Sequence, residues 1–156
     1  MLTVFPGVTT IYLVKEADSG HPGSWPGPPK LRPLTREGRR QARDLATHLE
    51  ARPISRILTG PNLRCRETVI PLADARGLAI ESDEALGDVA GVKRALDLIR
   101  AAGAGPPPGP LLICAHADLV DAMVAQLVLD GWVDEDGGSL QDGILWQLEE
   151  PATTAG

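Results

Sequence analysis

The sequence predicts an α/β fold with three layers, in which helices cover both faces of a mostly parallel sheet. Short apolar runs, typical of buried strands, alternate along the chain with longer stretches whose apolar residues have helical spacing. The chain has 156 residues, of which 43% are hydrophobic, and it contains no internal repeat. We therefore expect a single domain over residues 1–150 and a disordered tail over 151–156.

The first predicted strand and the first predicted helix flank a long loop. Residues 9–14 form a short apolar run that predicts a buried strand. The stretch 19–34 is rich in Gly and Pro and predicts a loop, in which residues 21–29 would form either a lid over a site or a surface linker. Thr35 can cap a helix that extends to about Ala51. The apolar face of this helix comprises Ala42, Leu45, Ala46 and Leu49.

The middle of the chain predicts two more strands joined by a helix. Residues 54–58 form the second apolar run. A helix is expected over about 62–76, with Pro61 suited to its first turn and Gly77 as its C-cap. Residues 78–80 predict the third strand.

The last part of the chain continues the same alternation. A helix is expected over 89–102, followed by a loop over 103–110. The compact apolar run 111–114 predicts a strand, and a helix over about 118–130 follows it. Residues 143–148 predict a final strand.

Polar residues follow three of these strands. Lys15 and Glu16 end the first, Arg64 lies about one turn into the helix after the second, and His116 follows the run 111–114. Because ligands of such folds bind at the carboxyl ends of parallel strands, these side chains are candidates for one site. An arginine beside the free amides of a helix start favours an anion.

Each candidate also has a structural interpretation. The lysine–glutamate pair would be a solvated turn, and Arg64 would be a surface residue paired with Glu67 or Asp74. A lone histidine at a strand end is as often structural as functional.

Composition excludes several classes of function. The formal net charge of −6 argues against a nucleic-acid or anionic-membrane surface, and no apolar run has the length of a membrane span. The N-terminus lacks the features of a signal peptide. We expect no metal and no cofactor, because ligand spacing and a Gly-rich nucleotide loop are both missing. The two cysteines, Cys65 and Cys114, predict reduced thiols in a cytoplasmic protein.

Four short motifs follow one another along the chain. They are the turn Lys15-Glu16-Ala17, the helix start Leu34-Thr35-Arg36-Glu37-Gly38, the segment Thr59-Gly60-Pro61-Asn62-Leu63-Arg64-Cys65-Arg66-Glu67-Thr68, and the turn Ala115-His116-Ala117. In order and spacing they resemble the Arg-His-Gly, Leu-Thr-x-x-Gly, Ser-Ser-Pro-x-x-Arg and Ser-His-Gly motifs of the histidine phosphatase superfamily. The resemblance covers roughly residues 9–148 and implies a phosphoglycerate mutase-like fold, similar to that of small bacterial phosphohistidine phosphatases.

The resemblance also implies a phosphoryl-transfer site. In that family a histidine in the first turn attacks the phosphoryl group, and two arginines and a second histidine bind its oxygens. Arg64 and His116 match one arginine and the second histidine. Lys15 stands at the other arginine position, and Glu16 stands at the position of the nucleophile.

Other positions of the site follow from the same comparison. The acid that protonates the leaving group is expected at Asp88, with Glu84 as the alternative. Gly60 and Ala117 replace a serine and a glycine of the family motifs, and these are milder changes of the pocket walls. Lys15 keeps a positive charge but lacks the planar two-pronged grip of arginine.

Glu16 is the largest departure from the family pattern. An ionised carboxylate there would face an incoming phosphate, and two unit charges about 4 Å apart repel by on the order of 4 kcal/mol at an effective dielectric of ~20. We therefore expect Glu16 to pair with Arg64, Lys15 or protonated His116. The chain would then be a degenerate phosphatase, or pseudoenzyme, that keeps part of an anion pocket and binds a phosphorylated small molecule, another anion or a protein.

Two alternatives keep the site active. In the first, the chain is a phosphatase or phosphotransferase of small phosphorylated substrates or phosphohistidine, and Glu16 accepts the phosphoryl group as an acyl phosphate. In the second, Glu16 acts as a general base and His116 as an acid in a different reaction, for which the sequence names no substrate.

Overall fold

The computed structural model describes residues 10–104, 109–133, 139–141 and 144–151. Within these ranges the chain forms six strands and four α-helices. The strands are β1 (Ile11–Lys15), β2 (Arg56–Thr59), β3 (Ile80–Ser82), β4 (Leu111–Ala115), β5 (Ser139–Gln141) and β6 (Leu145–Leu148). The helices are α1 (Arg36–His48), α2 (Leu63–Arg76), α3 (Val92–Ala104) and α4 (Ala117–Leu129).

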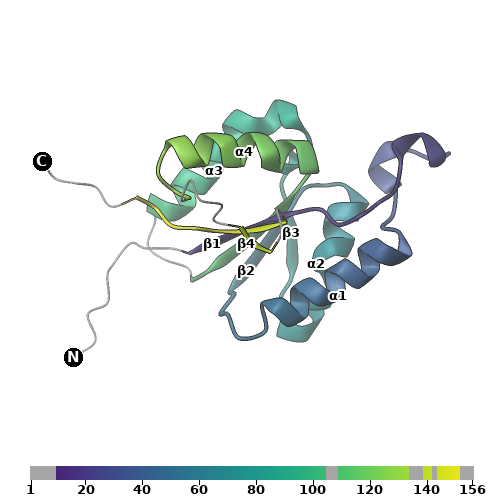
Figure 1. Ribbon diagram of the computed structural model, residues 1–156, viewed down its shortest axis with the longest axis horizontal. Coiled ribbons are helices and arrows are strands. Elements are labelled where there is room, and N and C mark those ends of the chain that lie inside the picture. The colour runs from purple at the N-terminus through teal and green to yellow at the C-terminus, as the bar shows by residue number, and fades with distance from the viewer. Residues whose placement is uncertain (1–9, 105–108, 134–138, 142–143, 152–156) are drawn as a thin grey trace, which may run out of the picture.

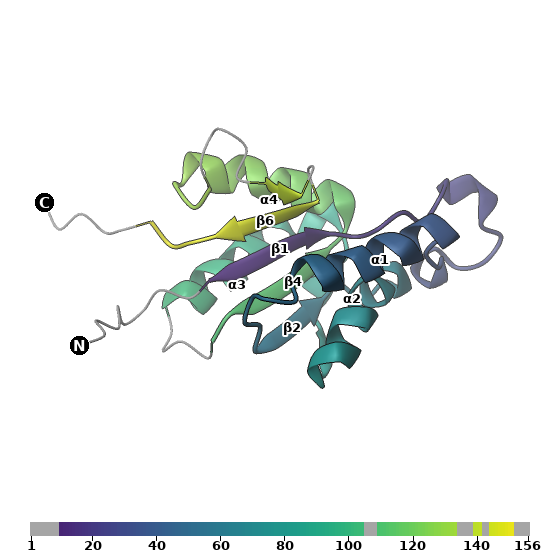
Figure 2. The same cartoon turned by 60° about the horizontal axis from the view of Figure 1, so that its bottom comes forward.

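The strands form one sheet with the order β3-β2-β4-β1-β6-β5. The four strands β3, β2, β4 and β1 are parallel, whereas β6 pairs antiparallel with β1, and β5 pairs antiparallel with β6. Helices α3 and α4 cover one face, and α1 and α2 lie side by side on the other (Figures 1 and 2). The predicted three-layer α/β fold with a mostly parallel sheet is therefore confirmed.

Each face of the sheet contributes to its own hydrophobic core, because successive side chains of a strand point to opposite faces. Ile11 and Leu13 of β1 pack in the core under α3 and α4. Tyr12 and Val14 of the same strand pack in the core against α1 and α2. This alternation sets the directions in which the two charged residues at the end of β1 leave the strand.

The helix boundaries agree with local capping chemistry. Thr35 is the N-cap of α1, where its hydroxyl accepts a hydrogen bond of 3.0 Å from the amide of Gly38. Gly77 ends α2 in the left-handed conformation with φ of 64°, as expected for a C-cap glycine. The expected position of Pro61 was wrong, because Asn62 is the N-cap of α2 and Pro61 precedes it.

Several boundaries differ from those expected by a few residues. Helix α1 ends at His48 rather than near Ala51, and β3 begins at Ile80 rather than 78. The segment expected to open the third helix forms a 3₁₀ turn over Val89–Gly91, which Asp88 caps through its carboxylate. Strand β5 was not expected, because its three residues are too short to form a sequence pattern.

The Gly- and Pro-rich loop is held by specific contacts. It contains two 3₁₀ turns, Pro22–Ser24 and Pro29–Leu31. Arg32 Nη1 donates to the carbonyls of Ser19 and Gly20 at 3.0 and 2.7 Å, which closes the loop at its base. The loop therefore has a defined path that returns to the start of α1.

Some expectations concern residues that the structure does not describe. Residues 105–108 of the expected loop and 152–156 of the expected tail are not described, so the domain limits at 150 and 151 stay predictions. Among the described helices, none has the length and apolarity needed to cross a membrane.

Candidate functional site

Glu16 follows β1 and is nearly enclosed, with 7% of its side chain exposed. Its Oε2 lies 2.9 Å from Arg64 Nε and accepts a hydrogen bond of 3.3 Å from the Cys65 thiol. Its Oε1 lies 3.5 Å from the amide of Ala117, the first residue of α4. The carboxylate thus sits between an arginine and a helix N-terminus, two groups that attract anions.

Arg64 lies in the first turn of α2, and 8% of its side chain is exposed. It does not pair with Glu67 or Asp74, which was the structural interpretation of this residue. Its Nη1 donates to the carbonyl of Pro29 at 3.0 Å. The Nε–H is not aligned with any acceptor, so the contact with Glu16 is an ion pair rather than a directed hydrogen bond.

The two cysteines lie behind this ion pair. Cys65 and Cys114 are both buried and are not joined by a disulfide. The hydrogen bond between the two thiols, followed by burial and by the nearby charge of Glu16, raises the pKa of Cys65 far above its usual range. The Cys65 thiol therefore stays protonated and serves as a donor to the carboxylate rather than as a nucleophile.

Lys15 is not brought together with Arg64. Its Nζ lies 2.7 Å from Asp121 Oδ1 on α4 and 5.9 Å from the centre of the Trp146 ring. This direction follows from the alternation along β1, since Lys15 lies on the α4 side of the sheet. A phosphate-binding role for Lys15 stays a prediction.

His116 is the single residue between β4 and α4, and it caps α4. Its Nδ1 accepts a hydrogen bond of 3.1 Å from the amide of Asp118. Since Nδ1 is the acceptor, the neutral ring carries its proton on Nε2, which is free to donate to a ligand. The His116 amide donates to Leu86 O at 3.2 Å, which fixes the adjacent 3₁₀ turn (Glu84–Leu86).

A cavity of about 530 Å³ opens in front of these residues. Arg64, His116, Asp88 and Glu84 all line it, so the structure brings together four of the expected site residues. Glu16 and Lys15 are not among its lining residues. The remaining lining residues are Pro29, Lys30, Pro61, Asn62, Gly87, Val89 and Asp118.

Both candidates for the acid face this cavity. Asp88 Oδ1 accepts a hydrogen bond of 2.9 Å from the amide of Ala90. Glu84 Oε2 lies 4.0 Å from Lys30 Nζ, and both of these side chains are exposed. An acid role for either carboxylate stays a prediction.

The glycine at position 60, where the family motif has a serine, has a steric reason. A Cβ atom on this residue would lie 2.6 Å from Leu86 O, the carbonyl that also accepts the His116 amide. A serine at this position would push away the turn that carries Glu84. Glycine therefore allows this wall of the cavity to lie close to the end of β2.

The sequence did not assign three polar residues of the cavity to the site. Asn62 could have been found, because it is the N-cap of α2 and lies a few residues after the end of β2. Its Nδ2 donates to Gly87 O at 3.1 Å. Asp118 lies in the first turn of α4, two residues after His116. Lys30 had no sequence signal, because the path of the loop brings it to the cavity.

Comparisons with known proteins find likenesses to phosphatases. Residues 23–93 match the family model described as histidine phosphatase superfamily (branch 1). The structure of the protein histidine phosphatase SixA complexed with tungstate is 25% identical to the chain, covers 76% of each chain and has a TM-score of 0.59. The family match covers less than half of the chain, and the likeness to this solved structure extends over about three quarters of it.

Two further likenesses are to phosphatases. A mycobacterial glucosyl-3-phosphoglycerate phosphatase in complex with VO3 has a TM-score of 0.64 at 19% identity, over 78% of this chain and 82% of that one. An 8-oxo-(d)GTP phosphatase from Mycolicibacterium smegmatis is 26% identical over 122 residues. The match includes 74% of this chain but 36% of that protein, so the chain spans about a third of this relative's length.

Proposed function

We propose that this chain is a degenerate member of the superfamily that binds a small polar molecule in the cavity without transferring a phosphoryl group. The observation that carries the proposal is the position of the Glu16 carboxylate, which is nearly enclosed and lies 2.9 Å from Arg64 Nε. A tethered carboxylate at this arginine takes the place of the phosphate that a phosphatase would bind there.

The electrostatics support binding without turnover. A phosphate that approached Arg64 would also approach Glu16, and two unit charges about 4 Å apart repel by on the order of 4 kcal/mol at an effective dielectric of ~20. This repulsion corresponds to a loss of roughly a thousandfold in affinity.

The enclosure of Glu16 also argues against the acyl-phosphate alternative. A nucleophile must reach the phosphorus atom, yet this carboxylate does not line the cavity. Its oxygens are already engaged by Arg64, by the Cys65 thiol and by the approach of the Ala117 amide.

The cavity still offers donors to a ligand. Lys30 and the Nε2–H of His116 face it, and the carboxylates of Glu84, Asp88 and Asp118 can accept hydrogen bonds there. Such a mixture of donors and acceptors suits a small polar molecule that carries groups of both signs.

Turnover assays test the proposal directly. The purified chain would be incubated with p-nitrophenyl phosphate, phosphohistidine, glucosyl-3-phosphoglycerate and 8-oxo-dGTP, the last three chosen from the names of the relatives. We expect no turnover and no hydroxylamine-sensitive phosphoenzyme. Robust turnover that disappears in Arg64→Leu, with circular dichroism showing that this variant is folded, would overturn the proposal, and a labelled Glu16 would establish the acyl-phosphate alternative.

A repaired site provides the matched comparison. The double substitution Lys15→Arg with Glu16→His restores the family residues at both positions. We expect it to gain phosphatase activity over the parent chain. Addition of Arg64→Leu to the repaired chain should abolish that activity again.

A further inference from the structure

A groove between α1 and α2, separate from the cavity described above, leads to an inference that does not depend on the proposed function. The groove has a volume of about 300 Å³ and lies between α1 and α2. Ala42, Ile70 and Pro71 give it an apolar floor, and 38% of Ile70 is exposed. The remaining lining residues are Arg39, Arg43, Glu67 and Asp74.

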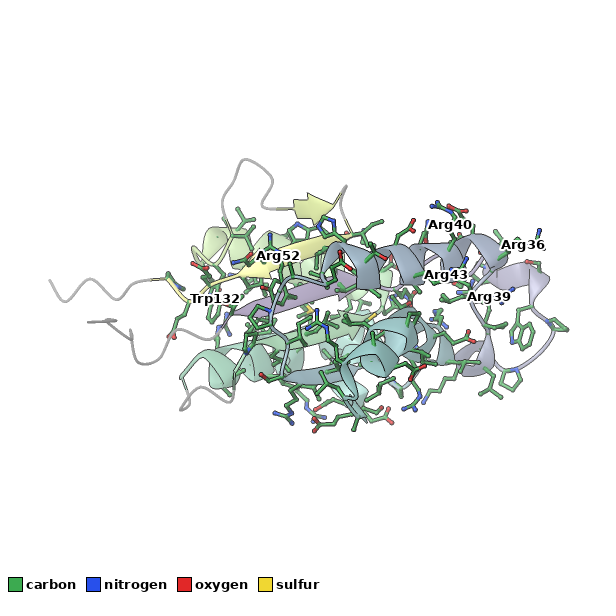
Figure 3. The ribbon with its side chains drawn as sticks, turned by 90° about the horizontal axis from the view of Figure 1, so that it is seen from below. Arg36, Arg39, Arg40, Arg43, Arg52 and Trp132 are labelled. Atoms are coloured by element: carbon green, nitrogen blue, oxygen red, sulfur yellow. The ribbon has the colours of Figure 1, made fainter. Side chains whose placement is uncertain are left out.

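One wall of the groove is cationic. Figure 3 shows Arg36, Arg39, Arg40 and Arg43 along α1 on the face seen from below. Arg40 pairs with carboxylates of its own helix, Glu37 and Asp44. The other three arginines have no carboxylate within 4.0 Å among the described residues, although the whole chain carries a formal net charge of −6.

The other wall is anionic. Glu67 and Asp74 lie one turn on either side of Ile70 on α2 and form no ion pair within the described chain. Glu67 Oε1 accepts a hydrogen bond of 2.9 Å from the amide of Leu34, whereas Asp74 is exposed. A purely acidic partner would be repelled by this wall, and a purely basic partner would be repelled by α1.

The two helices run in the same direction. The residue before the cap of α1, Leu34, contacts Glu67 near the start of α2. At the other end, Arg76 Nη2 donates to Leu49 O at 2.6 Å. Arg39 therefore stands nearer than Arg43 to the level of Glu67, and Arg43 stands nearer to that of Asp74.

We propose that the groove is a self-complementary surface on which a second copy of this chain docks. A two-fold axis along the groove places α1 of each copy over α2 of the other. Arg39 then faces Glu67 of the second copy, Arg43 faces Asp74 of the second copy, and the two Ile70 side chains meet at the axis. A two-fold axis across the helices would instead stack α1 on α1, with like charges opposed.

The net charge of the chain does not prevent this contact. Two copies repel each other at long range, but this repulsion is screened beyond about 8 Å at physiological ionic strength. The opposite charges across the groove act at short range, and they select the register of the two copies.

A charge-swap experiment tests the proposal by sedimentation velocity over a range of concentrations of the full chain. We expect the parent chain to form dimers. Arg43→Asp and Asp74→Arg, both at exposed positions, should each raise the dissociation constant of the dimer by about tenfold or more. An equimolar mixture of the two variants should recover the dimer, because the mixed dimer has one unchanged Arg43–Asp74 contact and one contact restored with its signs exchanged.

Arg40→Asp is the matched control, because Arg40 does not line the groove, and it should leave the dimer intact. Circular dichroism checks that each variant is folded. A parent chain that stays monomeric at every concentration would overturn the proposal. So would dimerisation that is insensitive to both swaps, or a mixture that remains monomeric although each variant is folded.

Discussion

Lys15 and Glu16 are neighbours in the chain, yet they enter opposite environments. Lys15 pairs with Asp121 at 2.7 Å, and these side chains are 26% and 60% exposed. Glu16 pairs with Arg64 at 2.9 Å, and these side chains are 7% and 8% exposed. The alternation of side chains along β1 sends the first residue toward α4 and the second toward α2.

The comparison shows how burial changes the meaning of an ion pair. An exposed pair is solvated before and after it breaks, so it contributes little to the free energy of unfolding. A buried pair has already lost its hydration, so removal of one partner leaves an uncompensated charge. We therefore expect Glu16 and Arg64 to depend strongly on each other, and Lys15 and Asp121 only weakly.

The largest effect is expected for Arg64→Leu. This substitution leaves the Glu16 carboxylate nearly enclosed without its cation, which should lower the free energy of unfolding by about 3–5 kcal/mol. Urea denaturation measures the change. Arg66→Leu, an exposed position two residues along the same helix, is the control and should change stability by less than about 0.5 kcal/mol.

The next largest effect is a recovery of stability in a double variant. Replacement of both partners, Glu16→Leu with Arg64→Leu, removes the buried charges together and should recover most of the stability lost in Arg64→Leu. A double variant as unstable as the sum of the two single variants would show that the two side chains do not interact.

Asp121→Asn tests the exposed member of the comparison. It removes the charge that faces Lys15, and the free energy of unfolding should fall by less than about 1 kcal/mol, with a still smaller loss in high salt. A loss as large as that of Arg64→Leu would contradict the distinction between the two pairs.

A second exposed ion pair, between Arg56 and Glu81, should make the free energy of unfolding depend on pH. The hydrogen bond from Arg56 lowers the pKa of Glu81 below its ordinary value of 4.5. A lowered carboxylate pKa stabilises the folded chain above pH 4.5, and this contribution is lost as the pH falls through the lower folded value. Denaturation from pH 7 to pH 3 should show Glu81→Gln less stable than the parent by about 0.2–1 kcal/mol at pH 7 and equally stable at the acid end.

The sequence predicted the fold well, because the signals were local and repeated. The apolar runs of β1, β2 and β4, the Thr35 cap and the Gly77 cap each carry their own physical signature. Strand β5 was missed because three residues carry no periodicity.

The site was predicted only in part. The approach of Arg64 and His116 to one cavity follows from strand ends that meet at one edge of the sheet. The separation of Lys15 from Glu16 was not predicted, because motif matching placed both in one phosphate site, although strand alternation explains it. Lys30 depends on the tertiary path of a Pro-rich loop, for which the sequence has no periodic signal.

The most direct test of the tethered carboxylate is the affinity of the chain for tungstate, measured by calorimetry. Glu16→Gln removes the charge, and Glu16→Ala also removes the bulk; Asp121→Asn serves as the control. We expect no measurable binding of tungstate by the parent chain or the control. The Glu16 variants should gain up to about a thousandfold in affinity for tungstate. Addition of Arg64→Leu to these variants should abolish the gain. Equal binding by the parent chain and both Glu16 variants would contradict the claim that Glu16 fills the anion site.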